Sequence, residues 1–173
     1  GLFRSTDGGE NWYSISNEID NIGVFVLKIS ASGDVYAGTL RSIYKSTDQG
    51  VSWAKVNNSY PENLYAEDIT FDASGNIYVS NSYSGIYKST DGGDSWTTVN
   101  NGLPQSSYIW KIGSTQNNIL LASDVYRGIY KSTDFGANWV QSNTGYDTTY
   151  YVNSFTSSPA GEIFISSAGN GPF

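Results

Sequence analysis

Short runs of apolar residues recur along the chain, and turn-forming residues separate them. Between residues 66 and 99 four such runs occur: Ala66–Asp72, Ile77–Ser80, Gly85–Ser89 and Ser95–Val99. The sequence Ala73-Ser74-Gly75-Asn76 between the first two is typical of a tight turn. Neighbouring residues of a strand face opposite sides of its sheet, and Ile77-Tyr78-Val79 is apolar on both. The pattern therefore predicts a four-stranded antiparallel sheet that is covered on both faces.

The same four-strand pattern repeats along the chain. Three whole units occupy residues 22–57, 65–100 and 108–143, while residues 1–17 supply the third and fourth strands of a split unit and residues 150–173 its first and second. A Ser-Thr-Asp-x-Gly-x-x-Trp motif lies between the third and fourth strands of each unit. Its copies start at residues 5, 46, 89 and 132, so they are 41, 43 and 43 residues apart. Such a period is typical of a four-stranded propeller blade. We therefore predict an all-β fold: a β-propeller segment with three whole blades and one split blade.

The number of units leaves the closure of the ring open. Propellers usually have about 4 to 8 blades, so four units are the lower limit. Gly171-Pro172-Phe173 matches the register of Gly1-Leu2-Phe3, and a self-closed four-blade ring would hold these residues twice. Three arrangements remain: further flanking blades in a longer array, self-association of two chains, and a closed four-blade ring.

Each copy of the motif carries a Ser, an Asp, a Gly and a Trp at fixed spacing. These residues are Ser5, Asp7, Gly9 and Trp12; Ser46, Asp48, Gly50 and Trp53; Ser89, Asp91, Gly93 and Trp96; and Ser132, Asp134, Gly136 and Trp139. An Asp in this setting suits a turn in which its side chain accepts hydrogen bonds from nearby backbone N–H groups. We expect the Gly to adopt a positive φ and the Trp to cover the hairpin. One Asp per loop is too few for a helix-flanked calcium loop, so we predict structural staples and no metal site.

The motif and its spacing resemble the Asp-box, or BNR repeat, of sialidases, xyloglucan-cleaving glycosidases, sortilin-type receptors and photosystem II assembly factors. The resemblance covers nearly the whole chain. It implies a β-propeller in which the boxes lie away from the ligand face. Because successive strands reverse direction, the loops that join units and the loops between second and third strands emerge on the face opposite the boxes. In the resembling families function is usually found on this second face.

Aromatic, acidic and arginine residues gather in the loops of that second face. They are Glu18, Asp20, Tyr60, Glu62, Tyr65, Tyr108, Tyr146, Asp147 and Tyr150 in one set of loops, and Arg41, Tyr83, Asp124, Tyr126 and Arg127 in the other. Flat rings beside charged groups suit a carbohydrate or an extended peptide. The residues we select as ligand-binding are Tyr65, Tyr83, Tyr126, Arg127 and Arg41.

Two kinds of glycosidase chemistry are alternatives to binding alone. A general acid and base would need two carboxylates about 5 to 9.5 Å apart, for which Glu62 and Asp124 are candidates, with Glu67 and Asp68 also near the cleft. Sialidases hold a carboxylate with three arginines, but Arg4 occupies the position of Lys45 beside the motif, and no Arg-Ile-Pro signature precedes the first motif. Sialidase chemistry is therefore not favoured. A hydrolase that uses paired carboxylates stays open, as does a purely structural repeat array.

The amino-acid composition limits the kinds of partner and chemistry that are expected. The net charge is −7, with 9 basic and 16 acidic residues, which disfavours nucleic acid and anionic membranes. The sequence has neither Cys nor His, so thiol nucleophiles, imidazole bases and the usual zinc ligands are excluded, and no cofactor is expected. There is no apolar run of membrane-spanning length, no signal-peptide pattern and no initiator Met, which indicates an excised or mature segment. We predict a noncatalytic ligand-binding or scaffold module of an extracellular or cell-surface protein.

Overall fold

The computed structural model describes residues 1–16, 19, 23–56, 58–60 and 65–169, and these form β-strands joined by turns and loops. The strands are β1 (Phe3–Arg4), β2 (Tyr13–Ser14), β3 (Val24–Ile29), β4 (Val35–Thr39), β5 (Ile43–Ser46), β6 (Ala54–Lys55), β7 (Asp68–Phe71), β8 (Ile77–Asn81), β9 (Gly85–Ser89), β10 (Thr97–Thr98), β11 (Ile109–Ser114), β12 (Leu120–Asp124), β13 (Gly128–Ser132), β14 (Val140–Gln141), β15 (Tyr150–Ser157) and β16 (Ile163–Gly169). This part of the chain has no helix that is long and apolar enough to cross a membrane.

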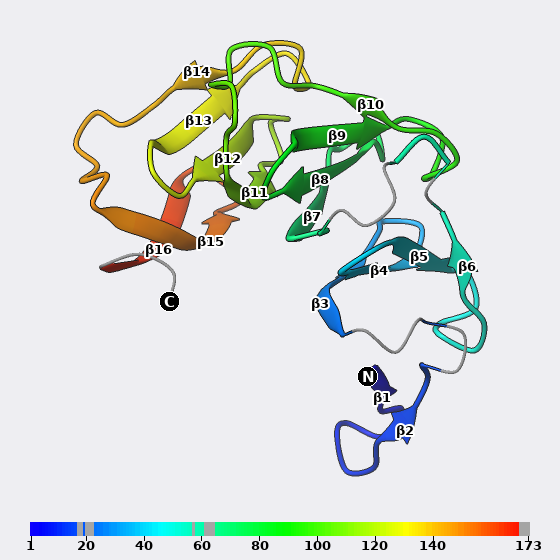
Figure 1. The fold of residues 1–173 in the computed structure, drawn as a ribbon. Coiled ribbons are helices and arrows are strands. Elements are labelled where there is room, and N and C mark those ends of the chain that lie inside the picture. The colour runs from blue at the N-terminus through cyan, green and yellow to red at the C-terminus, as the bar shows by residue number, and fades with distance from the viewer. Residues whose placement is uncertain (17–18, 20–22, 57, 61–64, 170–173) are drawn as a thin grey trace.

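Consecutive strands pair in antiparallel fashion. In the described residues they form three four-stranded sheets, β3–β4–β5–β6, β7–β8–β9–β10 and β11–β12–β13–β14, and two two-stranded sheets, β1–β2 and β15–β16. The sheets follow one another along an open arc, and the first strands β3, β7, β11 and β15 lie on its inner side (Figure 1). The strands of each predicted unit therefore follow one another in the predicted order. The fourth strand of each whole sheet is shorter than expected, because bends and turns of the Ser-Thr-Asp loop occupy residues that we assigned to it.

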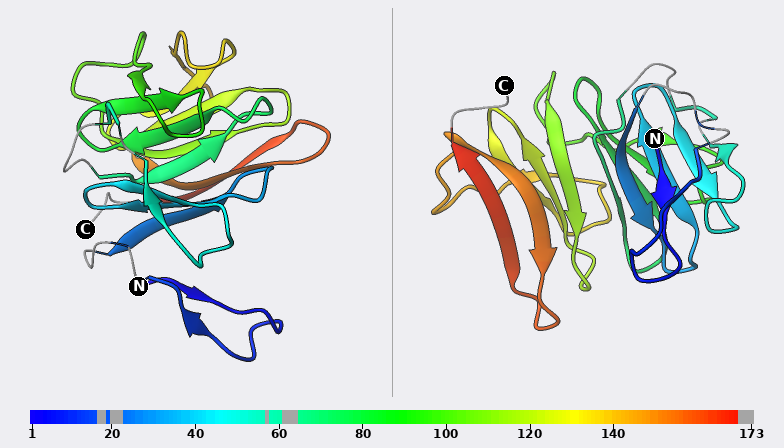
Figure 2. Two further views of the ribbon diagram at one scale, coloured as in Figure 1. Left: turned by 90° about the vertical axis from the view of Figure 1, so that its right-hand side faces the viewer. Right: turned by 90° about the horizontal axis from the view of Figure 1, so that it is seen from below.

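The two half-sheets stay apart. Within the described residues no strand pairing joins β1–β2 to β15–β16. The two hairpins lie at opposite ends of the arc, also when the molecule is seen from below (Figure 2). A four-blade ring closed by one chain is therefore not the arrangement in this structure, and the described strands form an open segment.

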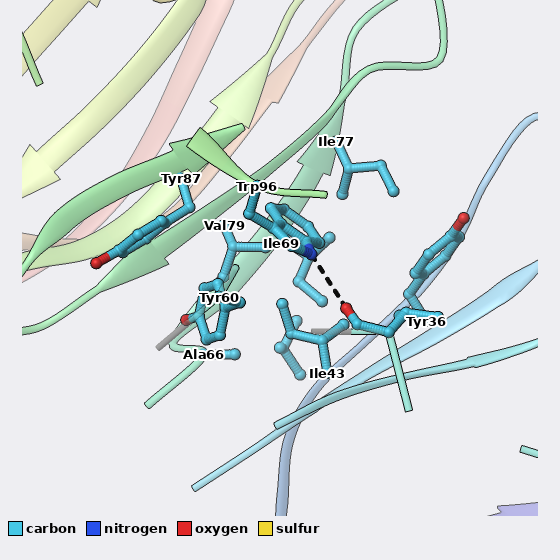
Figure 3. Packing of buried hydrophobic residues seen from close by; sticks show 11 residues of the cluster. Tyr36, Ile43, Tyr60, Ala66, Ile69, Ile77, Val79, Tyr87 and Trp96 are labelled. Carbon is cyan, nitrogen blue, oxygen red and sulfur yellow. Dashed lines mark hydrogen bonds between the residues drawn. The ribbon is translucent and has the colours of Figure 1, made fainter. Parts of the chain in front are cut away.

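Buried apolar side chains fill the boundaries between successive sheets. Figure 3 shows the boundary between the first two whole sheets, where Tyr36 and Ile43 face Ile69, Ile77 and Val79 of the next sheet. Comparable clusters lie at the other boundaries. Each fully buried Ile or Val contributes about 1.5–3 kcal/mol. Both faces of a central sheet are buried in this way, which accounts for the apolar neighbours in its strands.

The Ser-Thr-Asp loops have equivalent hydrogen bonds in all four copies, with an Asn amide in place of a Ser hydroxyl in the first and fourth. In the third copy Ser89 Oγ donates to Asp91 Oδ1 at 2.7 Å and accepts the Gly93 N–H at 2.8 Å. The Asp91 carboxylate in turn accepts the backbone N–H of Ser95 at 2.9 Å and its hydroxyl at 2.5 Å. The other copies repeat this network. The Ser95 bonds, with that from Ser89, lower the pKa of Asp91 to about 2.

The tryptophans of the second, third and fourth loops do more than cover their own hairpins. The indole Nε1 of Trp53 donates to the Ile15 carbonyl at 2.8 Å, that of Trp96 to Val56 at 3.0 Å and that of Trp139 to Val99 at 2.8 Å. Each of these carbonyls belongs to the residue that directly follows the last strand of the preceding sheet (Figure 3 draws the Trp96 bond). The prediction of a cover for the hairpin was therefore incomplete, because these residues also join neighbouring sheets.

Candidate functional site

Five aromatic side chains form a continuous series of ring contacts, which we call the aromatic row. Its members are Phe25, Tyr65, Tyr83, Tyr108 and Tyr126, and neighbouring ring centroids are 6.5, 6.3, 5.8 and 6.4 Å apart in that order. The rings meet edge to face, with interplanar angles of 60–79°. They belong to three successive sheets and the loops next to them. The row therefore crosses two sheet boundaries on the face opposite the Ser-Thr-Asp loops.

Four of the five rings of the aromatic row are exposed to solvent, and the fifth, Tyr108, is half-buried. Tyr126 is 71% exposed, Tyr83 67% and Phe25 56%. Aromatic side chains normally bury most of their surface, so a connected row with exposed rings is a candidate interaction surface. A hollow of about 240 Å³ next to Tyr83, lined also by Leu103, Pro104 and Gln105, adds relief to this surface.

A buried asparagine fixes the part of the row that belongs to the second whole sheet. Asn81, at the end of β8, has no exposed surface. Its Oδ1 accepts the N–H groups of Tyr83 and Ser84, both at 2.9 Å, and its Nδ2 donates to the Tyr65 carbonyl at 2.7 Å. One side chain therefore holds the backbone of two members of the row.

A buried aspartate has the same place in the next sheet. Asp124, at the end of β12, accepts the N–H of Tyr126 on Oδ1 at 2.9 Å and the N–H of Tyr108 on Oδ2 at 3.1 Å. Its Oδ2 also accepts a bond from Arg127 Nη1 at 3.3 Å, and its side chain is fully buried. We selected Asp124 as a weak catalytic candidate, but these contacts are those of a residue that positions the row. Glu62, the other candidate, lies outside the described residues.

The structure brings together some of the predicted ligand-binding residues. Tyr65, Tyr83 and Tyr126 are all in the row, and Arg127 lies beside it through its ion pair with Asp124. Arg41 is exposed in the corresponding loop of the first whole sheet, where its N–H donates to Thr39 Oγ1 at 3.2 Å. It has no place in the series of ring contacts. Tyr108 was noted among the loop residues but was not selected.

Two further aromatic residues were not recognised in the sequence. Phe25 and Trp110 lie at irregularities of β3 and β11, where the strand register shifts between Val24 and Val26 and between Ile109 and Lys111. Such bulges re-aim a side chain, and they are frequent next to functional sites. Trp110 stacks beside Tyr108, with ring centroids 6.5 Å apart. Both residues fall in predicted first strands of their units, and the signal that identifies them is their shared position in the repeat.

The sheets, their order and their packing define the class of the fold, which is a β-propeller. No model of a known protein family matches the chain, and no curated protein sequence matches it. Among solved structures it is similar to an ancestral GH74 enzyme, with a TM-score of 0.75 and 22% identity over 98% of this chain and 25% of that one.

Two other structures show the same likeness. YCF48 bound to the D1 peptide has a TM-score of 0.67 and 16% identity, over 95% of this chain and 54% of that one. The extracellular domain of a hybrid two-component system from B. thetaiotaomicron has a TM-score of 0.71 and 16% identity, over 96% of this chain and 22% of that one. At these identities the likeness establishes the fold alone. The chain spans between about a fifth and about half of these proteins.

Proposed function

We propose that the chain is a noncatalytic ligand-binding or scaffold module that takes carbohydrate or peptide on the aromatic row. The observation that carries this proposal is the row itself, because four of its five rings are exposed, and the rings are connected and held by buried polar side chains. Exposed rings offer flat apolar faces on which sugar rings stack. The likeness in fold to a GH74 enzyme and to YCF48 bound to a peptide supports ligand binding in general.

The hydrogen bonds beneath the row favour carbohydrate over peptide. An extended peptide gains affinity mainly by pairing its backbone with free backbone groups. Here the N–H groups of Tyr83, Tyr108 and Tyr126 already donate to Asn81 and Asp124. The carbonyls of Tyr65 and Tyr108 accept bonds from Asn81 and Val125. What the row presents to a ligand is therefore mainly its side chains.

A binding experiment tests this proposal. We would measure the affinity of the chain for a panel of soluble polysaccharides and peptides, and repeat the measurement with Tyr83→Ala combined with Tyr126→Ala. Loss of at least one stacked ring should weaken binding about tenfold or more, since such a contact contributes about 1.4 kcal/mol or more. Tyr13→Ala is the matched control, because Tyr13 is 62% exposed and lies on β2, outside the row. Unchanged binding to every ligand in the double variant would refute the proposal.

A glycoside hydrolase that uses paired carboxylates is the second candidate, because the fold matches that of a GH74 enzyme over 98% of this chain. The buried contacts of Asp124 count against its use as an acid or base. Reducing-end assays on a panel of polysaccharides distinguish the candidates: hydrolysis that Asp124→Asn abolishes without changing ligand affinity would favour the enzyme. A purely structural array is the remaining alternative, and no ligand would then bind the row.

We further propose that the chain is an Asp-box propeller whose half-sheets are completed by matching strands. The fourfold Ser-Asp-Gly hydrogen-bond network supports the family assignment. On β16 the residues Ile163, Phe164 and Ile165 are exposed, whereas β8 and β12 are buried throughout. A second copy or flanking blades would cover them, and the solution mass distinguishes these two. For its location we propose the extracellular space or cell surface, supported by the likeness to an extracellular domain.

A further inference from the structure

A polar hollow is lined by residues of the four first strands, β3, β7, β11 and β15, each of which contacts its neighbour along the arc. Its volume is about 250 Å³, and its lining includes Lys28 of β3, Asp68 of β7, Lys111 of β11 and Asn153 of β15. Every one of these strands comes from a different sheet. The hollow is therefore a place where a ligand can contact all four sheets at once.

The carboxylate in this hollow is already provided with donors. Asp68 is 8% exposed, and its oxygens accept the N–H groups of Ile69 at 3.0 Å and Ile112 at 3.4 Å. Lys28 Nζ lies 3.6 Å from Asp68 Oδ1. Burial raises the pKa of Asp68, while the charges of Lys28 and Lys111 act in the opposite direction. Both oxygens of Asp68 are thus engaged by backbone donors, and one lysine lies close to it.

The two lysines, in contrast, have donors to spare. An ammonium group carries three N–H donors, and 3.6 Å is longer than a normal N–H···O hydrogen bond. The Lys28 side chain is 45% exposed. Lys111 forms no ion pair within the described part of the chain, and its Nζ lies 5.0 Å from the Trp110 ring centroid. Two cations facing one carboxylate leave this hollow positive, in a chain whose net charge is −7.

The hollow is connected to the aromatic row. Trp110, over which Lys111 lies, stacks beside Tyr108 at an interplanar angle of 29°. Tyr108 contacts both Tyr83 and Tyr126 in the row. The strand register shifts between Ile109 and Lys111, so this part of β11 contributes Trp110 next to the row and Lys111 to the hollow. A chain-like ligand on the row can therefore reach the lysines through Trp110.

We propose that this hollow binds a carboxylate, so that the ligand of the aromatic row is an acidic polysaccharide with uronic acid units. The inference rests on the proposed function, in which sugar rings stack on the row. The carboxylate of a uronic acid accepts bonds from Lys28 and Lys111, whose charges exceed that of Asp68. The sugar units next to it lie on Trp110 and the row.

The test uses purified oligogalacturonate and its methyl ester, which has the same sugar rings without the charge. We expect the acid to bind at least tenfold more tightly than the ester at low salt. Lys28→Gln and Lys111→Gln should each weaken binding of the acid by about tenfold and leave that of the ester unchanged. Lys111→Arg should keep most of the affinity, because it keeps the charge. Lys131→Gln, on β13, is the matched control. Circular dichroism shows whether each variant keeps its fold.

The outcomes separate the inference from the proposed function. If acid and ester bind equally, and both depend on Tyr83 and Tyr126, the carboxylate subsite is wrong while the aromatic row remains the binding site. If the acid binds more tightly but Lys28→Gln and Lys111→Gln have no effect, the subsite is also wrong. Binding of peptides but of neither saccharide would overturn the acidic polysaccharide. Binding of nothing at all would overturn both proposals.

Discussion

Replacement of Trp96 by Phe removes one hydrogen-bond donor from the boundary between the first two whole sheets. Trp96 is 4% exposed, and its Nε1 donates to the carbonyls of Val56 and Gly93, both at 3.0 Å. Leaving the buried Val56 carbonyl without a donor costs about 1–3 kcal/mol. The smaller ring leaves a gap that adds about 1 kcal/mol. We therefore expect Trp96→Phe to lower the free energy of unfolding by about 2–4 kcal/mol.

The first Ser-Thr-Asp loop provides the matched control for this change. Trp12 is 62% exposed, and its Nε1 donates to Gly9 of its own loop at 3.0 Å. Water can replace that bond, so Trp12→Phe should change the free energy of unfolding by no more than about 0.5 kcal/mol. Urea unfolding followed by far-UV circular dichroism measures both variants. Equal losses for the two would refute the idea that the tryptophan joins neighbouring sheets.

Three further predictions concern the loops. The hydrogen bonds of Asp48 and Asp91 lower their pKa values from 3.8 to about 2, so in this pH range the folded protein binds fewer protons than the unfolded chain. The free energy of unfolding should therefore fall as the pH drops from 3.8 to about 2, and acid unfolding that is complete above pH 3.8 would contradict this. Asp124→Ala deprives three donors of their acceptor, so it should lower the free energy of unfolding in urea by about 2–4 kcal/mol and also weaken ligand binding. If both quantities stay unchanged, the positioning role of Asp124 is contradicted. Gly93→Ala places a Cβ 3.1 Å from the Val56 side chain at a φ of +101°, whereas Gly9→Ala has the strain of a φ of +97° without such a contact. Gly93→Ala should therefore lower the free energy of unfolding by about 1 kcal/mol more than Gly9→Ala in the same assay.

The fold was predictable because the repeat supplies its own register. Apolar residues at neighbouring positions of Ile77-Tyr78-Val79 indicated a sheet covered on both sides, and that sheet is found. The bond from Trp96 to Val56 was not predictable in the same way. It depends on where one sheet sits relative to the preceding one, and spacing along the chain contains no measure of that distance.

The candidate site was predictable only in part, for a related reason. Tyr65, Tyr83 and Tyr126 were placed on the loop face by strand direction alone, and the structure brings them into one row. Phe25 and Trp110 depend on bulges, which a regular two-residue alternation does not show. Bulges change which side a residue faces without changing the apolar pattern, so the row is longer than the sequence indicated.

The ends of the second strands explain why the loop face can differ between sheets while the fold stays the same. Thr39, Asn81 and Asp124 hold equivalent register positions, and each accepts N–H bonds from the loop that follows. The fold needs a polar acceptor there, and a hydroxyl, an amide or a carboxylate meets that need. A carboxylate at this position is therefore no sign of acid–base chemistry by itself. Because this acceptor holds the loop backbone, the loop side chains are free to differ. They are Arg41 in the first whole sheet and Tyr83 and Tyr126 in the next two. Specificity in this propeller is accordingly expected to follow the loop residues and the inner lysines.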